Sequence, residues 1–410
     1  MNPTAVPPPT KRWTWVYILL CVALLGAIGF FATANITNDS VDYYSTLKNI
    51  VDPDEVSIVP NLSLENERSP GYPLLALPTY YLVSTFIEPR IVTLDIDMPF
   101  DGAATLDVSN EQQMQIGFPL RQHFVHDIFF KNFYIGDYRG KYDWVIIFAL
   151  LFTSYLFLFV GLKTMLGTLK HIYQEVNAQV IVTLMVLTSP ALLMAVIQTP
   201  IYATLTAVGL SAVFVYWYTR SYMEIPSTSA FFAGLGMGFL VLTRLECVIL
   251  LAVVSIGLLC TPSRRKLPAL LLGVAVPGIV LLGYNFWRFG NPFDVALFQG
   301  GISSIVANQN FVFSSLVDPA SGIIVWSALT IIGILGLFFG NRYLKILGVA
   351  SVVFIVIIYR AELSRIDINR YITVLIPFAV VGIATIVNNF KLYKKRRALR
   401  KLQQKPHEIV

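Results

Sequence analysis

Two carboxylates follow the first long apolar stretch of the sequence. The stretch "WVYILLCVALLGAIGFFATA" leads into "TNDSVDYYSTLKNIV" (residues 37–51), so Asp39 and Asp42 stand within about one helical turn of its end. A carboxylate at a helix N-terminus stays ionised, because the free backbone N–H groups and the helix dipole favour the anion. Such a group can act as a general base and deprotonate an acceptor hydroxyl. The alternative is structural, with Asp39 or Ser40 as the helix cap and Asp42 in the first turn.

Four arginines form a second set of candidates. Arg244 lies with Glu246 in "TRLE" between two apolar stretches, where an ionisable residue is costly unless it is paired. Arg288 lies in "WRFGNP", and Arg365 and Arg370 lie in "YRAELSRIDINRY". A guanidinium can bind a phosphate through two parallel hydrogen bonds. These residues therefore predict a site for an anionic partner such as a lipid phosphate.

Each arginine also has a structural interpretation. Arg244 can form an internal ion pair with Glu246, and Arg288 can be an interfacial anchor beside Trp287. Arg365 and Arg370 can pair with the acids of their own connection. Both interpretations stay open for all four residues.

A metal site is not predicted. His123, His126 and Asp127 stand together in "HFVHD", but two histidines in a predicted strand or loop are weak evidence for a metal. We expect no metal and no cofactor. The cysteines all lie in apolar runs, which predicts buried thiols rather than a disulfide framework: Cys21, Cys247 and Cys260.

Composition places these candidates in a polytopic membrane protein. Of the 410 residues, 56% are hydrophobic and 13% are charged, whereas a soluble domain is about 25% charged. A transmembrane helix needs about 20 apolar residues. The candidate spans are 15–35, 144–166, 178–197, 200–218, 228–243, 246–261, 267–287, 321–339, 343–359 and 370–389. The pair 228–243 and 246–261 is short and predicts a tight helical hairpin.

Lysines and arginines set the predicted orientation. Lys11 and Arg12 precede the first span, which places the N-terminus in the cytoplasm. With ten spans, the basic tail also lies in the cytoplasm. The formal charge of +6 is then a topology signal and argues against a nucleic-acid partner. The predicted regions are a cytoplasmic N-terminus (1–14), the first transmembrane helix (15–35), an extracytoplasmic loop (36–143), a nine-helix transmembrane region (144–389) with an outer loop (288–320), and a cytoplasmic tail (390–410).

The large outer loop carries its own predicted elements. Tyr43, Leu47, Ile50 and Val51 fall on one face of an amphipathic helix, which we expect along the outer membrane surface. The stretch 71–86 is apolar but short and contains prolines, so we expect an interfacial or re-entrant piece. Alternation over 91–109 predicts an antiparallel hairpin of a small β-subdomain, and "HDIFFKNFYIG" can supply a third strand.

Several stretches together resemble a known family. "DSVDY" is similar to an acidic motif D-E-x-x-Y, with Asp39 as the first acid and Tyr43 as the tyrosine, although Ser40 replaces the second acid. "RSPGYPLLALP", "GLGMGFLVLTRLE", "YNFWRFGNPF", "LVDPASGIIVWS" and "INRYITVLIPF" resemble later motifs in the same order. The family is the polyprenyl-phosphate-sugar-dependent glycosyltransferases with the C-type fold, which includes bacterial relatives of the protein O-mannosyltransferases. Relatives often carry an acid just after the third span, where "QTPIYAT" has none.

The resemblance implies a glycosyltransferase of the cell (inner) membrane, active on the extracytoplasmic face. A sugar would move with inversion from a polyprenyl-phosphate donor to a hydroxyl of a glycan, lipid or protein acceptor. Asp39 would be the base with Asp42 nearby, and the four arginines would bind the donor phosphate. The resemblance also implies three supporting residues: Tyr43, Glu246 and Asn291. The alternative is a non-catalytic polytopic membrane protein, either a lipid-linked-sugar transporter or a scaffold.

Overall fold

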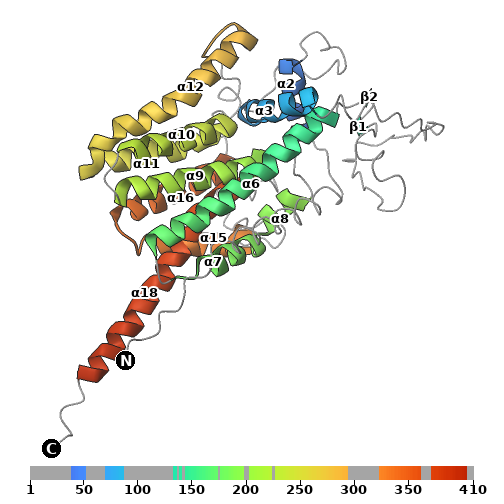
Figure 1. The fold of residues 1–410 in the computed structure, drawn as a ribbon. Helices are drawn as coiled ribbons and strands as arrows, with labels where there is room; N and C mark the ends of the chain where they lie inside the picture. Colours follow the sequence, from blue (N-terminus) through green and yellow to red (C-terminus); the bar gives the residue numbers. More distant parts are fainter. Residues whose placement is uncertain are drawn as a thin grey trace, which may run out of the picture. The chain divides into compact units, whose positions relative to one another are not determined.

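The computed structural model describes a chain built mainly from helices (Figure 1). The described residues are 38–51, 70–86, 133–135, 138–140, 144–173, 176–197, 203–223, 227–293, 323–361 and 371–403. The chain divides into two units. Unit 1 comprises Met1–Val160 and Met194–Thr206, and unit 2 comprises Gly161–Leu193 and Ala207–Val410.

The elements follow this division. Unit 1 contains α2 (Asn38–Val51), α3 (Gly71–Phe86), β1 (Phe133–Ile135), β2 (Tyr138–Gly140) and the first half of α6 (Trp144–Ile172). α8 (Pro190–Ile197) and α9 (Ala203–Met223) cross the boundary. Unit 2 contains the rest of α6 together with α7 (Ala178–Leu187), α10 (Ser227–Thr243), η2 (Leu245–Cys247), α11 (Val248–Leu259), η3 (Pro262–Lys266), α12 (Leu267–Phe289), α15 (Ile323–Leu337), α16 (Arg342–Ala361), η4 (Thr373–Leu375) and α18 (Ile376–Gln403).

Unit 1 has a core of aromatic and aliphatic side chains. Tyr43 of α2 and Tyr72 of α3 meet edge to face, with ring centroids 5.1 Å apart. The Tyr72 hydroxyl donates to the carbonyl oxygen of Leu150 at 2.8 Å and lies 2.8 Å from the Ser154 hydroxyl, both on α6. Burial raises the pKa of Tyr72 against the opposing effect of Ser154, so the phenol stays neutral and ties α3 to α6.

The predicted orientation of the amphipathic helix needs correction. The helix exists as α2, but Tyr43 and Leu47 are buried in a cluster with side chains of α3 and α6, and Val51 packs against that cluster. The apolar face was expected on the membrane surface. In the structure it packs on protein, because α3 supplies a competing apolar surface that the repeat pattern of α2 alone does not reveal.

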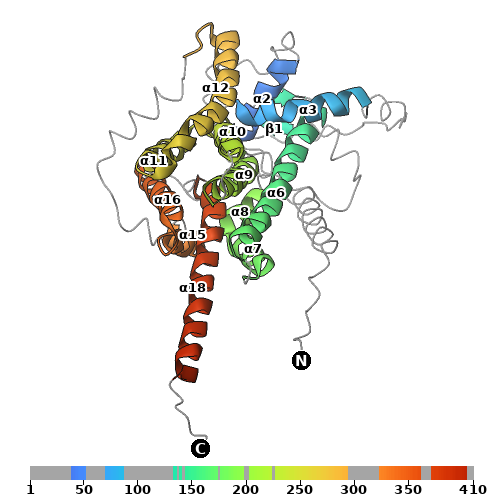
Figure 2. The same cartoon turned by 60° about the vertical axis from the view of Figure 1, so that its left-hand side comes forward.

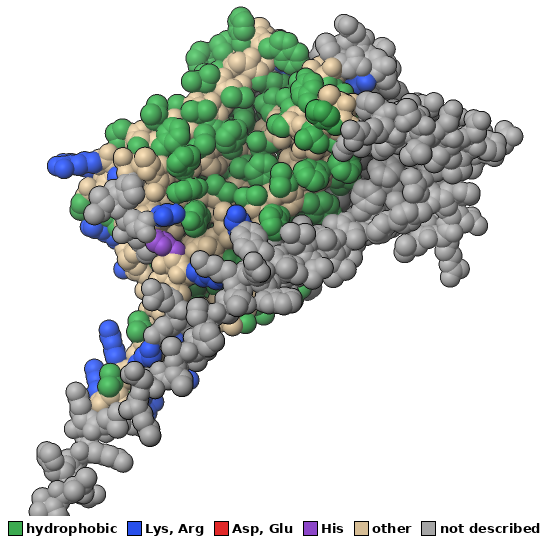
Figure 3. Space-filling model, in the orientation of Figure 1, with side chains coloured by type: hydrophobic (Ala, Val, Ile, Leu, Met, Phe, Trp, Pro, Cys, Tyr) green, Lys and Arg blue, Asp and Glu red, His purple; other side chains and the backbone are tan. Residues whose placement is uncertain are grey.

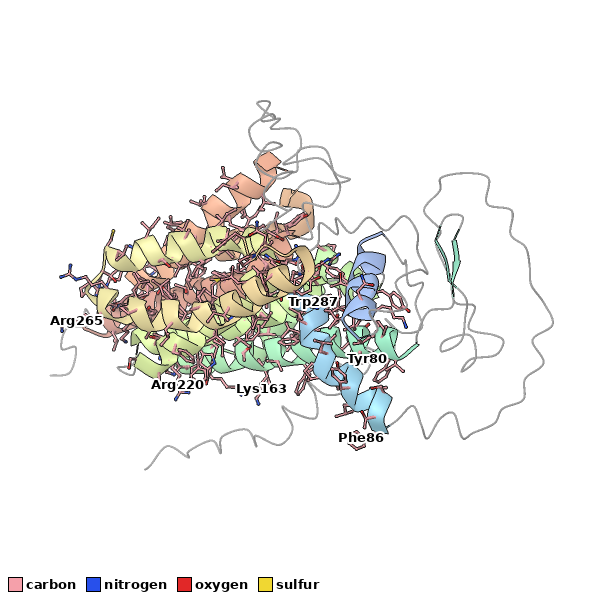
Figure 4. The ribbon with its side chains drawn as sticks, turned by 90° about the horizontal axis from the view of Figure 1, so that it is seen from above. Tyr80, Phe86, Lys163, Arg220, Arg265 and Trp287 are labelled. Atoms are coloured by element: carbon pink, nitrogen blue, oxygen red, sulfur yellow. The ribbon has the colours of Figure 1, made fainter. Side chains whose placement is uncertain are left out.

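α3 is the apolar stretch 71–86, and it is a single helix of 16 residues with Pro78 inside it. At 1.5 Å per residue it is about 24 Å long, which is short for a span. Its second half exposes Tyr81, Leu82 and Phe86, and Phe86 lies at its free end (Figure 4). The interfacial or re-entrant placement of this helix stays a prediction.

A small antiparallel hairpin is present in the described part of the outer loop. β1 pairs with β2 in the register Phe133↔Gly140. β1 lies within the stretch that was predicted as a third strand, and β2 was not predicted. The predicted hairpin at 91–109 lies outside the described residues.

Glycines set the helix packing of unit 2. α10 packs along α12, and a Cβ at Gly234 would overlap the carbonyl oxygen of Leu270. α15 packs along α18, and a Cβ at Gly382 would overlap the carbonyl oxygen of Gly333. Small residues let helix backbones approach closely in a membrane, where apolar burial alone gives little preference for another helix over lipid.

One predicted span and one predicted hairpin differ from the structure. The span 178–197 is two helices, α7 and α8, because Pro190 lacks an N–H and starts a new helix at its first position. The hairpin 228–243 and 246–261 has the predicted helices, but α10 makes its main contacts with α12, and α11 makes its main contacts with α16. The connection reverses the chain without pairing the two helices along their length.

The basic tail is part of the last helix. α18 continues without interruption from Ile376 to Gln403, and its last turns are exposed. Figures 1 and 2 show this helix extending beyond the other helices of unit 2. The predicted tail begins at residue 390, within this helix, so the tail continues the axis of the preceding predicted span.

Several described helices suit a membrane. Three are long and apolar enough to cross one by length and composition, namely Phe148–Ile172, Pro262–Arg288 and Thr373–Arg400. Shorter apolar helices occur among the described residues as well. On the face in Figure 3, hydrophobic side chains cover much of the described surface, and Lys and Arg side chains gather toward the end from which α18 extends.

Candidate functional site

The candidate site of unit 2 is built around Arg244. The Arg244 Nη1 atom donates to Glu246 Oε1 at 3.1 Å, and the two side chains are 10% and 20% exposed. The guanidinium carbon lies 4.9 Å from the centre of the Tyr371 ring. A nearly buried cation therefore has both a carboxylate and an aromatic face as partners, and this arrangement fixes its position.

The local backbone explains why the pair forms. α10 ends at Thr243, and Arg244 is extended with φ −141° and ψ 99°. η2 begins at the next residue, so Glu246 returns toward Arg244 over a spacing of two residues. The Arg244 N–H still donates to the carbonyl oxygen of Leu240 at 2.8 Å, and the Cys247 N–H donates to that of Arg244 at 3.0 Å. The predicted ion pair is thus present, held by a hydrogen-bonded turn.

Two neighbouring groups add to the polarity of this turn. Tyr371 belongs to "INRYITVLIPF", so the structure joins two stretches that lie far apart in the sequence. The Thr243 hydroxyl is buried without a hydrogen-bond partner. Sequence reasoning missed Tyr371 and Thr243 as site residues; the only signal was that each adjoins a candidate arginine, Arg370 or Arg244.

Arg288 has a separate environment at the end of α12. Its Nη1 atom donates to the Tyr284 hydroxyl at 2.5 Å, one helical turn away. Gly290 then ends the helix in the left-handed region with φ 69°, and the Asn291 side chain accepts from the Phe293 N–H at 3.1 Å. A turn therefore follows Arg288 directly. Trp287 is exposed beside it (Figure 4), which suits the anchoring interpretation.

The carboxylates of the opening stretch lie on α2 in unit 1. The helix begins at Asn38, one residue before the predicted cap, so Asp39 lies in the first turn and Asp42 begins the next. Tyr43, the predicted supporting residue, points into the core of unit 1 rather than away from it. α2 is therefore anchored from the residue directly after Asp42.

The remaining candidates lie outside the described residues. They are Arg365, Arg370, His123, His126 and Asp127. Within the described ranges, no group of three His, Cys, Asp or Glu residues could hold a metal ion.

The cysteines were expected to be buried. Cys247 is buried, but Cys260 is exposed at the end of α11. Cys21 lies outside the described residues. The expectation for Cys260 was wrong, because a residue in an apolar run need not be buried within the protein.

Comparisons with known proteins bear on the fold. No protein-family model and no curated protein sequence matches this chain. The structure is similar to the crystal structure of ArnT from Cupriavidus metallidurans in the apo state, with a TM-score of 0.52, 14% sequence identity, and coverage of 92% of this chain and 60% of that chain. Archaeal oligosaccharyltransferase AglB from Archaeoglobus fulgidus, solved with an inhibitory peptide and a dolichol-phosphate, gives a TM-score of 0.47 at 12% identity over 98% of this chain and 53% of that chain.

The likeness to ArnT shows the fold. The predicted fold class, an α-helical polytopic membrane protein with the C-type fold, is confirmed. The chain spans about 60% of the length of the ArnT chain. The number of spans and the O-mannosyltransferase kinship stay predictions.

Proposed function

We propose that this protein is a glycosyltransferase that moves a sugar from a polyprenyl-phosphate donor to an acceptor hydroxyl. The observation that carries the proposal is the Arg244–Glu246 pair, nearly buried and stacked on Tyr371. Buried ion pairs are weak devices for stability, because desolvation offsets much of their attraction. Because an ionisable residue between two apolar helices is costly to bury, it is a candidate for a functional role. The likeness in fold to ArnT supports this reaction class.

The proposed reaction is a single displacement. The acceptor oxygen attacks the anomeric carbon while the bond between that carbon and the phosphate oxygen breaks. Asp39 takes the acceptor proton, and the lipid phosphate leaves with the electron pair. Attack opposite the leaving group inverts the anomeric centre. Asp42 has an electrostatic role beside Asp39, since the first turns of a helix favour an anion.

The arginines act on the leaving group. Negative charge grows on the phosphate in the transition state, and a cation fixed in place stabilises that charge without reorganising. Arg244 is fixed by Glu246 and Tyr371, which makes it the first choice for this role. Arg288, Arg365 and Arg370 are further candidates for the donor phosphate. Glu246 supports the position of Arg244, and Asn291 supports the turn after Arg288 by accepting from the Phe293 N–H. No metal is assigned a step.

The predicted topology places the reaction outside the cytoplasm. The N-terminus and the basic tail are assigned to the cytoplasm of a cell (inner) membrane, and the Arg244 turn then faces the opposite side. The acceptor is a glycan, lipid or protein hydroxyl, in line with the resemblance. The missing acid after the third predicted span leaves the choice of acceptor to experiment.

The test is release of the lipid phosphate. Purified full-length protein is incubated with a panel of polyprenyl-phosphate sugars and with candidate acceptors, and the freed polyprenyl phosphate is measured. We expect release with at least one donor, and loss of release with Arg244→Gln. Arg264→Gln removes an exposed arginine of η3 as the matched control. A protein that moves intact donor across liposomes without cleavage is a transporter, and one that does neither is a scaffold; both results overturn the proposal.

A further inference from the structure

A second polar cluster lies in unit 2, far along the helices from the Arg244 turn. It joins the end of α9, the short helix η3 and the start of α16. The Tyr222 and Tyr343 rings stack with centroids 5.2 Å apart, and the Tyr343 hydroxyl lies 2.7 Å from Ser263 Oγ. Tyr218 donates to the carbonyl oxygen of Tyr343 at 3.2 Å. Three connections that are distant in sequence thus form one packed site, which we term the α9–η3–α16 site.

Cations surround this site. The Lys266 ammonium donates to the carbonyl oxygen of Ser221 and lies 5.4 Å from the centre of the Tyr222 ring. The Arg342 guanidinium lies 5.0 Å from the Tyr343 ring. Figure 4 places Arg220 and Arg265 in the same region of unit 2, away from Trp287 at the other end of α12. Among the described residues of unit 2, the only acid is Glu246, which belongs to the Arg244 turn.

Two buried hydroxyls in the site lack hydrogen-bond partners. They are Ser221 Oγ and the Tyr222 hydroxyl, whose residues are 0% and 7% exposed. Leaving a buried hydroxyl unsatisfied costs about 1–3 kcal/mol, so each such group calls for a missing partner. Lys266 contacts both residues: its ammonium donates to the carbonyl oxygen of Ser221 and lies over the ring of Tyr222. Two hydroxyl donors beside an ammonium suit the oxygens of a phosphate.

The surroundings favour a lipid phosphate over a free one. α11 exposes Ile256 and Leu259 just before η3, and Phe339 is exposed just before α16. Apolar side chains that precede a basic connection can contact acyl chains while the connection reaches the head group. The positive-inside topology places this end at the cytoplasmic leaflet, where anionic lipids attract basic segments.

We propose that the α9–η3–α16 site binds the phosphate head group of an anionic phospholipid from the cytoplasmic leaflet. Lys266 and the hydroxyls of Ser221 and Tyr222 hold the phosphate, and Arg342 stands beside it. This lipid site is distinct from the proposed donor site at Arg244, and it does not depend on transfer activity.

The experiment is a titration of detergent-purified full-length protein. Dioctanoyl phosphatidylglycerol, dioctanoyl phosphatidylcholine and inorganic phosphate are added separately, and the dissociation constant and melting temperature are measured. We expect saturable binding and a raised melting temperature with phosphatidylglycerol only. Equal binding of the two lipids overturns the proposal. Stabilisation by inorganic phosphate to the same extent assigns the site to the free ion and also overturns it.

Variants separate a built site from general surface charge. Lys266→Gln removes a charge-assisted hydrogen bond and should weaken phosphatidylglycerol binding about tenfold or more. Arg264→Gln removes an exposed charge from the same short helix, and general attraction to an anionic surface accounts for at most about fivefold. Equal losses in the two variants contradict a specific site.

Tyr222→Phe gives the sharpest contrast because it changes no charge. If the hydroxyl is only an unsatisfied group, its removal leaves phosphatidylglycerol binding unchanged. If it donates to the phosphate, binding weakens about two- to tenfold, while the melting temperature without lipid stays equal or rises. Unchanged binding by a folded Tyr222→Phe protein, together with unchanged binding by Lys266→Gln, rules the site out.

Discussion

The pair Arg244–Glu246 permits an experiment that separates stability from catalysis. The variants are Arg244→Met, Glu246→Leu and the combination of both. At 3.1 Å the Coulomb attraction is about 5 kcal/mol for an effective dielectric constant of about 20, before desolvation is counted. Removing one partner leaves the other charge nearly buried without its counter-ion, which costs about 3–5 kcal/mol. Removing both avoids that penalty, so the double variant should be close to the parent protein in stability.

Catalysis should follow a different order. If Arg244 stabilises the leaving phosphate, the double variant lacks that cation and should turn over about a hundred- to a thousand-fold more slowly, despite its stability. Arg244→Met should be both unstable and slow. Glu246→Leu keeps the cation, with Tyr371 still beside it, and should retain more activity than either variant that lacks Arg244.

The assays are thermal unfolding in detergent and release of polyprenyl phosphate from the donor that proves active. Arg264→Gln, an exposed arginine in η3, controls for loss of positive charge. A stable double variant with near-parent turnover would refute the catalytic role and leave the pair as a structural device. A double variant as unstable as Arg244→Met would refute the energetic argument, because it would show that the cost comes from packing rather than from an unpaired charge.

Three other outcomes are expected. Asp39→Asn should leave expression and melting temperature unchanged, since Asn suits a helix start about as well as Asp, and should lower turnover by about a hundred- to ten-thousand-fold. Asp42→Asn should lose less turnover. Normal turnover by Asp39→Asn would remove the base assignment. Gly234→Ala should destabilise the protein by at least about 1 kcal/mol in thermal unfolding, because the added Cβ overlaps α12. Gly283→Ala has open space around it and should stabilise the protein by up to about 1 kcal/mol. Equal melting temperatures of the two variants would contradict this packing. A reporter tag after residue 110 should be extracytoplasmic, and a cytoplasmic signal would mean that the ten-span topology is wrong.

The sequence predicted charges better than it predicted their surroundings. An arginine and a glutamate separated by one residue between apolar helices have few alternatives to pairing, and the structure pairs them. The partner ring of Tyr371 comes from a distant segment, and no local pattern indicates which ring will lie over a guanidinium. Pro190 was a readable signal for a helix break, but the long apolar run outweighed it in the prediction of one span.

The spacing of apolar residues predicted which face of a helix is apolar, but it did not predict which element packs against that face. The face of α2 with Tyr43 and Leu47 was correctly identified, yet its cover is Tyr72 and the side chains of α6 rather than a membrane surface. The same limit applies to the glycines of α10. Their spacing shows that a backbone can approach closely, while the choice of α12 as partner depends on the whole arrangement of unit 2.

The packing of α10 bears directly on the proposed chemistry. Electrostatic stabilisation of a leaving group requires a cation that does not reorganise during the reaction. Arg244 directly follows α10, and Gly234 seats that helix against α12. Beyond the helix end, Glu246 and Tyr371 fix the guanidinium itself. A solvated surface arginine would need neither close helix packing nor two dedicated partners. Because Arg244 has both, we favour a chemical role for it over membrane anchoring. Anchoring better suits Arg288, which lies beside the exposed Trp287.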